Sequence, residues 1–312
     1  MSISTTVFHR SELLAESDLV PVAPGEGATC PFCSGTACHP VWTLQDSPPI
    51  TLLCCTDCHG ISASRMPTDR ALSRYYGSYY QGDASAEQIT FDRPDRLAQR
   101  IAAHYIPSHN TAQISILDFG GGDGTVANLV AAALLKTREA VINIDIVDYA
   151  EKTVEPAHPN VHLTHKSSIE EVAARYDIVI ASAVVEHHPM AGELLSRLLD
   201  HVREETGLFY ARTPSMLPLM SLASKVGFQL DFTYPGHLHD LGQRFWETYL
   251  DRRQDEFQLL ESTPSIPETT FRAHFLRALA ARLFKAPWYL LGRRYTCVGG
   301  WQVFVRRSTA VH

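Results

Sequence analysis

The sequence lacks several features that mark membrane, exported or nucleic-acid-binding proteins. It has no run of about 18 apolar residues, so no membrane-spanning helix is expected. No basic stretch followed by an apolar run opens the chain, so no signal peptide is expected. Positive charge is not in excess, because the formal net charge is −7, which argues against a partner rich in phosphate. These absences predict a cytoplasmic protein that does not have nucleic acid as its main partner.

Cysteine is nearly absent outside one short stretch. Six of the seven cysteines lie within residues 30–58, and Cys297 is the exception. In a reducing compartment such crowding favours metal binding over disulfides. The stretch contains CPFC and CTDC, two C-x-x-C pairs made by Cys30, Cys33, Cys55 and Cys58. Four thiolates from two tight turns suit a tetrahedral zinc ion, and a fully ligated ion would be structural rather than catalytic.

Other residues of the same stretch leave the ligand set open. Cys38 and Cys54 are spare cysteines in this interpretation, and His39 or His59 could replace one of the four thiolates. Free structural thiols without a metal are the alternative interpretation.

Composition divides the 312 residues into four regions. These are an N-terminal extension (1–24), the zinc-binding segment (25–65), a helical and aromatic linker (66–110) and an α/β domain (111–312) with a helical insertion near 268–286. From residue 113 short β-branched runs alternate with helical patterns, which predicts a mostly parallel sheet with helices on both faces. Asp240 and Gln243 are spaced as a capping box for a helix over 240–250.

The stretch ILDFGGGDGT, residues 116–125, carries the most information about ligands. A predicted strand ends at Asp118, Gly120, Gly122 and Gly124 alternate, and a helix follows. Glycines allow a ligand to approach the main chain closely, and the following helix start offers N–H groups. The dinucleotide pattern G-x-G-x-x-G fails here, because Thr125 occupies its last position.

Acidic and hydroxyl side chains follow the next two predicted strands. Asp145 or Asp148 could accept both hydrogen bonds of a ribose diol, and Asp148 is preferred because it stands at the strand end. Ser167 and Ser168 follow the next predicted strand, where either hydroxyl could contact a ligand or serve as a helix N-cap.

A further strand, within residues 176–189, ends in Glu186, His187 and His188. A loop at the carboxyl end of a parallel strand borders the ligand crevice, and histidine is matched to proton transfer at neutral pH. His237, just before a predicted helix, is a further catalytic candidate, and Tyr76 is a weaker one. Structural support of a pocket, capping and packing are the alternative roles of these residues.

The glycine spacing resembles motif I of class I S-adenosylmethionine-dependent methyltransferases, which have a Rossmann-like sheet. The resemblance implies a cofactor site made by Asp118, Gly120, Gly122, Gly124, Asp148 and Ser168. Together with the paired C-x-x-C turns, the chain resembles bacterial methyltransferases of sugar-nucleotide, polysaccharide and natural-product pathways. The loop after the fourth strand lacks the [DN]-P-P-[YF] sequence that is frequent in enzymes methylating amino groups of bases.

We therefore expect methyl transfer to a hydroxyl or carbon of a small, sugar-containing metabolite, with S-adenosylmethionine and zinc bound. An RNA-modifying methyltransferase and a non-catalytic binding module with the same fold are the alternatives. A basic helix at 271–285, carrying Arg272, Arg277, Arg282 and Lys285, could touch a membrane surface, although a lid or packing helix is preferred. No pattern in the sequence indicates an oligomeric state.

Overall fold

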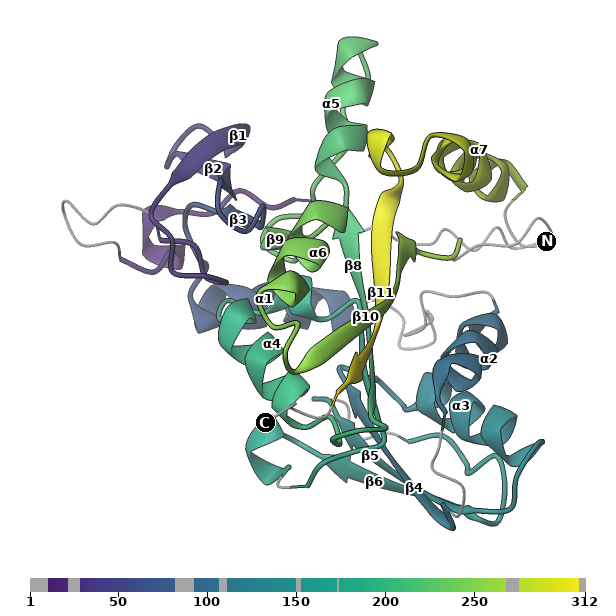
Figure 1. Cartoon of the computed structure of the whole chain (residues 1–312). Helices are drawn as coiled ribbons and strands as arrows, with labels where there is room; N and C mark the ends of the chain where they lie inside the picture. Colours follow the sequence, from purple (N-terminus) through teal and green to yellow (C-terminus); the bar gives the residue numbers. More distant parts are fainter. Residues whose placement is uncertain are drawn as a thin grey trace, which may run out of the picture.

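The chain forms a large and a small β-sheet with helices packed around them (Figure 1). The computed structural model describes residues 11–21, 29–81, 93–106, 111–149, 153–172, 174–267 and 275–308. The large sheet contains β4 (Gln113–Phe119), β5 (Val141–Val147), β6 (Val161–Lys166), β7 (Ile178–Ser182), β8 (Leu208–Ser215), β10 (Phe257–Pro264) and β11 (Gly299–Arg307).

The strands of the large sheet follow the order β10-β11-β8-β7-β4-β5-β6. The five strands from β8 to β6 are parallel, whereas β11 runs antiparallel to both of its neighbours. The chain leaves β4 toward β5 on one side and later returns to β7 on the other side. Ligands of such sheets bind at the carboxyl ends of the strands where this reversal occurs. The Rossmann-like α/β fold expected from the sequence is confirmed.

Helices cover both faces of this sheet. They include α2 (Pro94–His104) and α3 (Thr125–Leu135) on one face, and α4 (Ala191–Asp200) and α6 (Gln243–Asp251) on the other. Strand β7 shows why both faces are covered: Ile178 and Ile180 pack in the cluster with α2 and α3, whereas Val179 and Ala181 pack with α4 and α6. Successive side chains of a strand point to opposite faces, so the four consecutive apolar residues of β7 need a cover on each side.

The small sheet joins segments that lie far apart in the sequence. It has the order β1-β2-β3-β9, with β1 (Cys38–Gln45), β2 (Ile50–Cys55), β3 (Ile61–Ala63) and β9 (His239–Asp240). Strand β9 pairs with β3 through Ile61 opposite Asp240 and Ser62 opposite His239. A core that includes the fully buried Leu52 and Leu238 lies beneath these strands. The cysteine-rich segment is therefore bound to the later half of the chain.

The remaining helices lie at the edges of the two sheets. They are α1 (Asp69–Gln81), α5 (Leu217–Lys225), α7 (Phe275–Leu291) and the 3-10 turns η1 (Glu16–Asp18), η2 (Ile169–Glu171), η3 (Val185–His187) and η4 (Gly292–Arg294). The helix expected near 268–286 is described only from Phe275, so Arg272 lies outside the described residues. Leu276 and Leu283 of α7 are 77% and 62% exposed, whereas Ala278 is fully buried and the Trp288 ring lies 5.8 Å from that of Trp301, so α7 packs on the domain through one face. No helix in the described part of the chain is long and apolar enough to cross a membrane.

Candidate functional site

The glycine loop, residues 120–124, connects β4 to α3. Gly120, Gly122 and Gly124 have φ angles of +66°, +58° and +82°, a conformation that other residues rarely adopt. A Cβ atom on Gly120 would lie 2.5 Å from the Val184 side chain, and one on Gly124 would lie 2.3 Å from Ile146. A Cβ on Gly122 would meet nothing within 4 Å. Close packing therefore requires glycine at the two outer positions, whereas Gly122 faces open space.

Asp118 lies buried beneath this loop. The residue is 2% exposed, and a Cβ on Gly121 would lie only 2.4 Å from the Asp118 carboxyl carbon. Burial raises the pKa of the Asp118 carboxyl to about 7, because a low dielectric disfavours the charged form. Its Oδ2 atom has no hydrogen-bond partner among the described residues. Such a buried acceptor is matched to a ligand that brings a donor or a positive charge.

Of the two acidic candidates after the second strand of the domain, Asp148 faces the loop. It directly follows β5, and its Oδ2 accepts a hydrogen bond of 2.8 Å from the Gly122 N–H. Asp145 lies within β5, where its Oδ2 accepts a hydrogen bond from the Tyr176 hydroxyl and lies 3.9 Å from Lys166 Nζ. Asp148 is therefore the carboxylate at the glycine loop, whereas the Asp145 carboxylate interacts with side chains of neighbouring segments of the sheet.

Ser168 has a local role in the structure. Its Oγ accepts a hydrogen bond of 3.0 Å from the Glu170 N–H and thereby caps the η2 turn. The Ser167 hydroxyl donates to Glu171 of the same turn. Both hydroxyls are engaged by the turn that follows β6, which is the capping role that the sequence left open.

Three candidate catalytic residues from two segments converge beyond the end of β7. Glu186 and His187 belong to η3, and His237 lies on the loop before β9. One ligand atom of each lies within 4.8 Å of the others, and His187 Nε2 is 3.9 Å from Glu186 Oε1. A hydrogen bond of 2.8 Å from the Leu238 N–H to the Glu186 carbonyl joins the segments. We call Glu186, His187 and His237 the carboxylate–histidine cluster.

Hydrogen bonds orient both imidazole rings of this cluster. His187 Nδ1 lies 2.7 Å from the Gly236 carbonyl oxygen, which can only accept, so Nδ1 carries the proton. His237 Nδ1 lies 2.7 Å from Thr233 Oγ1, and that hydroxyl donates to the Phe232 carbonyl. The hydroxyl therefore accepts from His237 Nδ1–H. In the neutral form of each ring, Nε2 is then the nitrogen with the lone pair.

The structure places two other candidates differently. His188 is not part of the carboxylate–histidine cluster: its Nδ1 accepts a hydrogen bond of 3.2 Å from the Met190 N–H, near the start of α4. Burial lowers the pKa of His188, which favours its neutral form. Tyr76 of α1 does reach the cluster, with its hydroxyl 3.2 Å from His187 Nδ1.

Sequence patterns missed the residues that orient the cluster. Thr233 and the Gly236 carbonyl position the two histidines, and Val184 packs against the glycine loop. A threonine, a backbone carbonyl and a valine carry no chemical signature of their own. Only the folded position of the loop reveals their role.

The four cysteines of the paired C-x-x-C turns also converge. Cys30 Sγ lies 3.4 Å from Cys58 Sγ, and Cys33 Sγ lies 3.6 Å from Cys55 Sγ. Zinc–sulfur bonds of about 2.3 Å in a tetrahedron imply sulfur–sulfur distances of roughly 3.8 Å, close to those observed. All four Sγ atoms lie within 4.8 Å of one another. We call these four residues the cysteine cluster. In the described part of the chain this group includes neither His39 nor His59.

Both turns of the cysteine cluster have the same backbone pattern. Ser34 N–H donates to the Cys30 carbonyl at 2.9 Å, and His59 N–H donates to the Cys55 carbonyl at 3.0 Å. Ser34 and His59 both have positive φ angles, 58° and 60°. Cysteine N–H groups donate in turn to the carbonyls of the following glycines, Gly35 and Gly60. Two equivalent turns thus present two thiols each to one point.

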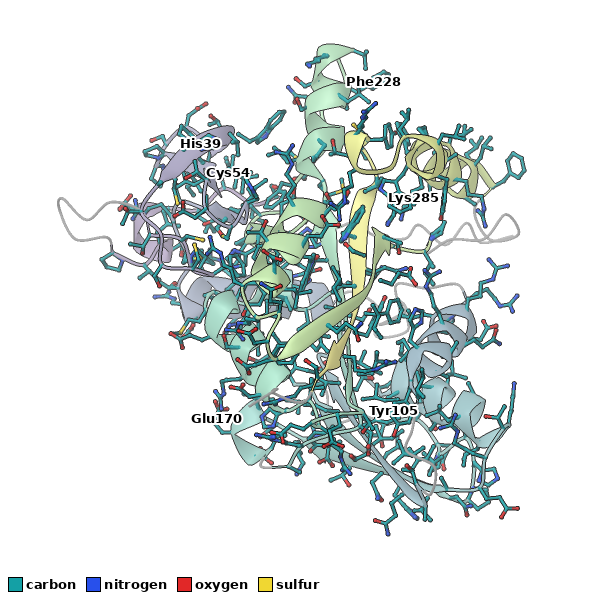
Figure 2. The ribbon with its side chains drawn as sticks, in the orientation of Figure 1. His39, Cys54, Tyr105, Glu170, Phe228 and Lys285 are labelled. Carbon is teal, nitrogen blue, oxygen red and sulfur yellow. The ribbon has the colours of Figure 1, made fainter. Side chains whose placement is uncertain are left out.

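The spare cysteines lie outside this arrangement. Cys38 and Cys54 are strand residues of the small sheet, where Figure 2 labels Cys54 beside His39. Burial raises the pKa of the Cys38 thiol to about 11 and also raises that of Cys54. Neither residue belongs to the group of four cysteines whose Sγ atoms converge, so the geometry leaves both outside the proposed ligand set.

The cysteine cluster is packed directly against the domain that carries the other two sites. A Cβ on Gly192 of α4 would lie 1.9 Å from the Pro31 carbonyl oxygen, and the Phe32 ring packs 4.6 Å from that of Phe245 and 5.2 Å from that of His239. Burial lowers the pKa of His239 to about 4, so its ring is neutral. His239 Nε2 lies 3.0 Å from the His188 carbonyl oxygen. Because a carbonyl oxygen can only accept, Nε2 carries the proton of the neutral ring and donates this hydrogen bond.

Comparison with known proteins identifies the fold that holds these sites. A family model described as a methyltransferase domain matches residues 83–266. No curated protein matches the chain significantly. Similar solved structures include the plantazolicin methyltransferase BpumL bound to SAH (16% identity, TM-score 0.45, covering 78% of this chain and 92% of that one). The [4+2]-cyclase SpnF is another (14% identity, TM-score 0.43, 69% and 82% covered).

A chain from the complex of the Haloferax volcanii Trm112 methyltransferase activator with a methyltransferase is also similar (13% identity, TM-score 0.44, 78% and 100% covered). Similarities of this extent do not indicate a substrate or a partner for the present chain.

Proposed function

Because the chain belongs to the methyltransferase-domain family and is an S-adenosylmethionine-dependent methyltransferase, we propose that it methylates a hydroxyl or carbon of a small, sugar-containing molecule. The glycine loop with Asp118 and Asp148 holds the cofactor in this proposal. The carboxylate–histidine cluster receives the reacting group of the acceptor. The cysteine cluster binds a structural zinc ion.

The residues around the glycine loop fit the cofactor. The unpaired Asp118 Oδ2 is matched to the ammonium group of the methionine part. The open space at Gly122 admits a ligand against the backbone, and Asp148 at the end of β5 can accept hydrogen bonds from ribose hydroxyls. Bound S-adenosylmethionine supplies a methyl group on a positively charged sulfur. We leave Ser168 out of the proposed site, because its hydroxyl caps η2.

The carboxylate–histidine cluster borders this cofactor site. Val184, two residues before Glu186, packs against Gly120, and β7 lies beside β4 in the sheet. An acceptor at the cluster would therefore sit next to the cofactor at the carboxyl edge of the sheet. Methyl transfer is an in-line displacement, so the enzyme must align the acceptor and accommodate the proton that its hydroxyl or carbon loses. Nε2 atoms beside a carboxylate are suited to that task.

One observation carries this proposal: the glycine loop, Asp148 and the carboxylate–histidine cluster meet at the same edge of the sheet, where its strand order reverses. Calorimetry with S-adenosylhomocysteine tests the cofactor half. We expect Asp148→Ala to weaken binding by roughly 10-fold or more, as loss of charge-assisted hydrogen bonds would. Asp145→Ala is the matched control and should change the affinity much less. Failure of the unaltered protein to bind would overturn the proposal.

The acceptor half needs a transfer assay. Radiolabelled methyl groups from S-adenosylmethionine should appear in members of a panel of hydroxylated small molecules that includes nucleotide-linked sugars. Transfer to RNA in place of every member of the panel would contradict the proposed acceptor class. A steep fall of RNA affinity with salt would support that different assignment.

A further inference from the structure

We propose that the carboxylate–histidine cluster is a binding site for a divalent transition-metal ion. The ion is separate from the zinc proposed for the cysteine cluster. It would bind the reacting oxygen of the acceptor, a use that rests on the proposed function, whereas binding of the ion itself does not.

The donor atoms of the cluster are of the kinds that bind such an ion. One carboxylate oxygen and one nitrogen from each of two imidazoles lie within 4.8 Å of one another. An ion with bonds of about 2.1 Å can join two atoms up to roughly 4.2 Å apart, and His187 Nε2 lies 3.9 Å from Glu186 Oε1. Two histidines and one carboxylate are a donor set used for iron, zinc, cobalt and related ions.

The hydrogen bonds behind the rings match those of metal-bound histidines. A ligating histidine usually donates its other ring N–H to a carbonyl, a carboxylate or water, which fixes the tautomer and the ring orientation. His187 does this through the Gly236 carbonyl, and His237 does it through Thr233 Oγ1. Both partners belong to the loop before β9. The same loop therefore supplies one ligand and orients the other.

Charge also favours a cation at this point. Glu186 is 2% exposed, and burying a carboxylate costs free energy that a bound cation offsets. One nitrogen of each imidazole lies within 4.8 Å of the other and of a Glu186 oxygen, so both rings can contribute a donor. Either a divalent ion or a proton on one histidine would offset the Glu186 charge, but only the ion would also use a nitrogen of each imidazole as a ligand.

Three protein ligands leave coordination positions open, unlike the four thiols of the cysteine cluster. With the Nε2 atoms engaged as ligands, the ion would replace them in handling the proton: an acceptor hydroxyl bound to the ion would lose its proton to water more readily, because a metal ion lowers the pKa of a bound hydroxyl. Its oxygen would then form a bond to the methyl carbon as the carbon–sulfur bond breaks. The electron pair of that bond stays on sulfur, which leaves neutral S-adenosylhomocysteine.

Cobalt binding to the zinc-loaded full chain tests the site without any acceptor. Equilibrium dialysis with Co²⁺ should show one cobalt per chain in addition to one zinc. The visible spectrum should contain the weak bands of nitrogen and oxygen ligation, without sulfur-to-cobalt charge-transfer bands. Cobalt that appears only in exchange for zinc, or no cobalt at all, would overturn the proposal.

Variants assign the ligands. Glu186→Gln and His237→Ala should each weaken Co²⁺ binding by at least about tenfold. Thr233→Val keeps all three ligands but removes the hydroxyl that orients His237, and we expect weaker binding with a shifted visible spectrum. His188→Ala is the matched control, because His188 directly follows His187 in the sequence but is not part of the cluster. This variant should bind cobalt like the unaltered chain. The zinc content of each variant is measured in parallel and reports how much of the protein is folded. Equal cobalt binding by all variants would contradict the ligand assignment.

The outcome is separable from that of the proposed function. Binding of S-adenosylhomocysteine and methyl transfer by a protein that binds no second metal would refute this inference alone. Cobalt binding by a chain that binds no S-adenosylhomocysteine would refute the proposed function alone.

Discussion

The glycine loop and the carboxylate–histidine cluster are neighbours that the chain builds in opposite ways. The loop is a few consecutive residues whose positive φ angles fix its shape, and Asp148 joins it from the adjacent strand. The cluster combines η3 with a distant loop, and β9 links that loop to the small sheet and the cysteine cluster. The cofactor geometry is therefore local, whereas the proposed acceptor geometry depends on long-range packing.

Disruption of the cysteine cluster should have the largest effect, and it should affect the carboxylate–histidine cluster much more than the glycine loop. Cys58→Ser removes one proposed zinc ligand, and structural zinc binding contributes about 10 kcal/mol or more to folding of small zinc domains. We expect the β3–β9 pairing to loosen and His237 to shift, with methyl transfer falling by roughly 100-fold or more. Affinity for S-adenosylhomocysteine should change by less than about threefold. Metal analysis, thermal unfolding, transfer assays and calorimetry measure these effects.

Cys54→Ser is the control for this experiment, because Cys54 lies on β2 outside the cluster. It should keep zinc, transfer and cofactor affinity. Parallel loss of transfer and of cofactor binding in Cys58→Ser would show that the two regions are not independent.

The buried carboxyl beneath the glycine loop predicts a pH effect. The pKa of Asp118 is raised from 3.8 to about 7, so between these values the folded chain binds a proton that the unfolded chain has lost. Its contribution is fully present below the unfolded pKa and is lost as the pH rises through about 7. Relative to Asp118→Asn, the free energy of unfolding should fall by roughly 2–3 kcal/mol between pH 5 and pH 8.

Denaturant unfolding at several pH values, taken as the difference between the two proteins, checks this expectation and cancels titration elsewhere in the chain. A difference that does not vary with pH, or that rises with pH, would contradict the raised pKa.

A smaller effect is expected at the junction that supports the acceptor side. His239→Ala removes the hydrogen bonds to Ser62 and to the His188 carbonyl and leaves a cavity beside Phe32. We expect the free energy of unfolding to fall by about 2–4 kcal/mol. Ser62→Ala, which removes only one of the two partners, should cost about 1 kcal/mol. Equal stability of His239→Ala and the unaltered protein in denaturant unfolding would refute the structural role of this junction.

The same contrast explains what the sequence could predict. The parallel sheet follows from apolar runs that alternate with helical patterns, and the glycine loop follows from spacing over a few residues; both depend on neighbours in the chain. The convergence of the four cysteines could also be inferred, because each C-x-x-C turn presents two thiols together. In each case the sequence distance is short.

Features that depend on distant partners could not be predicted. Asp240 was expected to cap the helix that follows it, yet its carboxylate accepts hydrogen bonds from the Met216 and Leu217 N–H groups at the start of α5. Gly242 is the N-cap of α6, without a side-chain hydrogen bond. Strand β9 has two residues, too few for an alternating pattern, although it carries the pairing that positions His237.

The most direct measurement of the central claim, that the glycine loop binds the cofactor, compares two glycines. Gly122 and Gly227 both have positive φ angles, 58° and 81°, and a Cβ on either would meet nothing within 4 Å. Substitution by alanine should therefore cost similar stability, about 1–2 kcal/mol. Calorimetry should show that Gly122→Ala binds S-adenosylhomocysteine at least about tenfold more weakly, whereas Gly227→Ala binds it normally. Equal affinities in the two variants would contradict the claim.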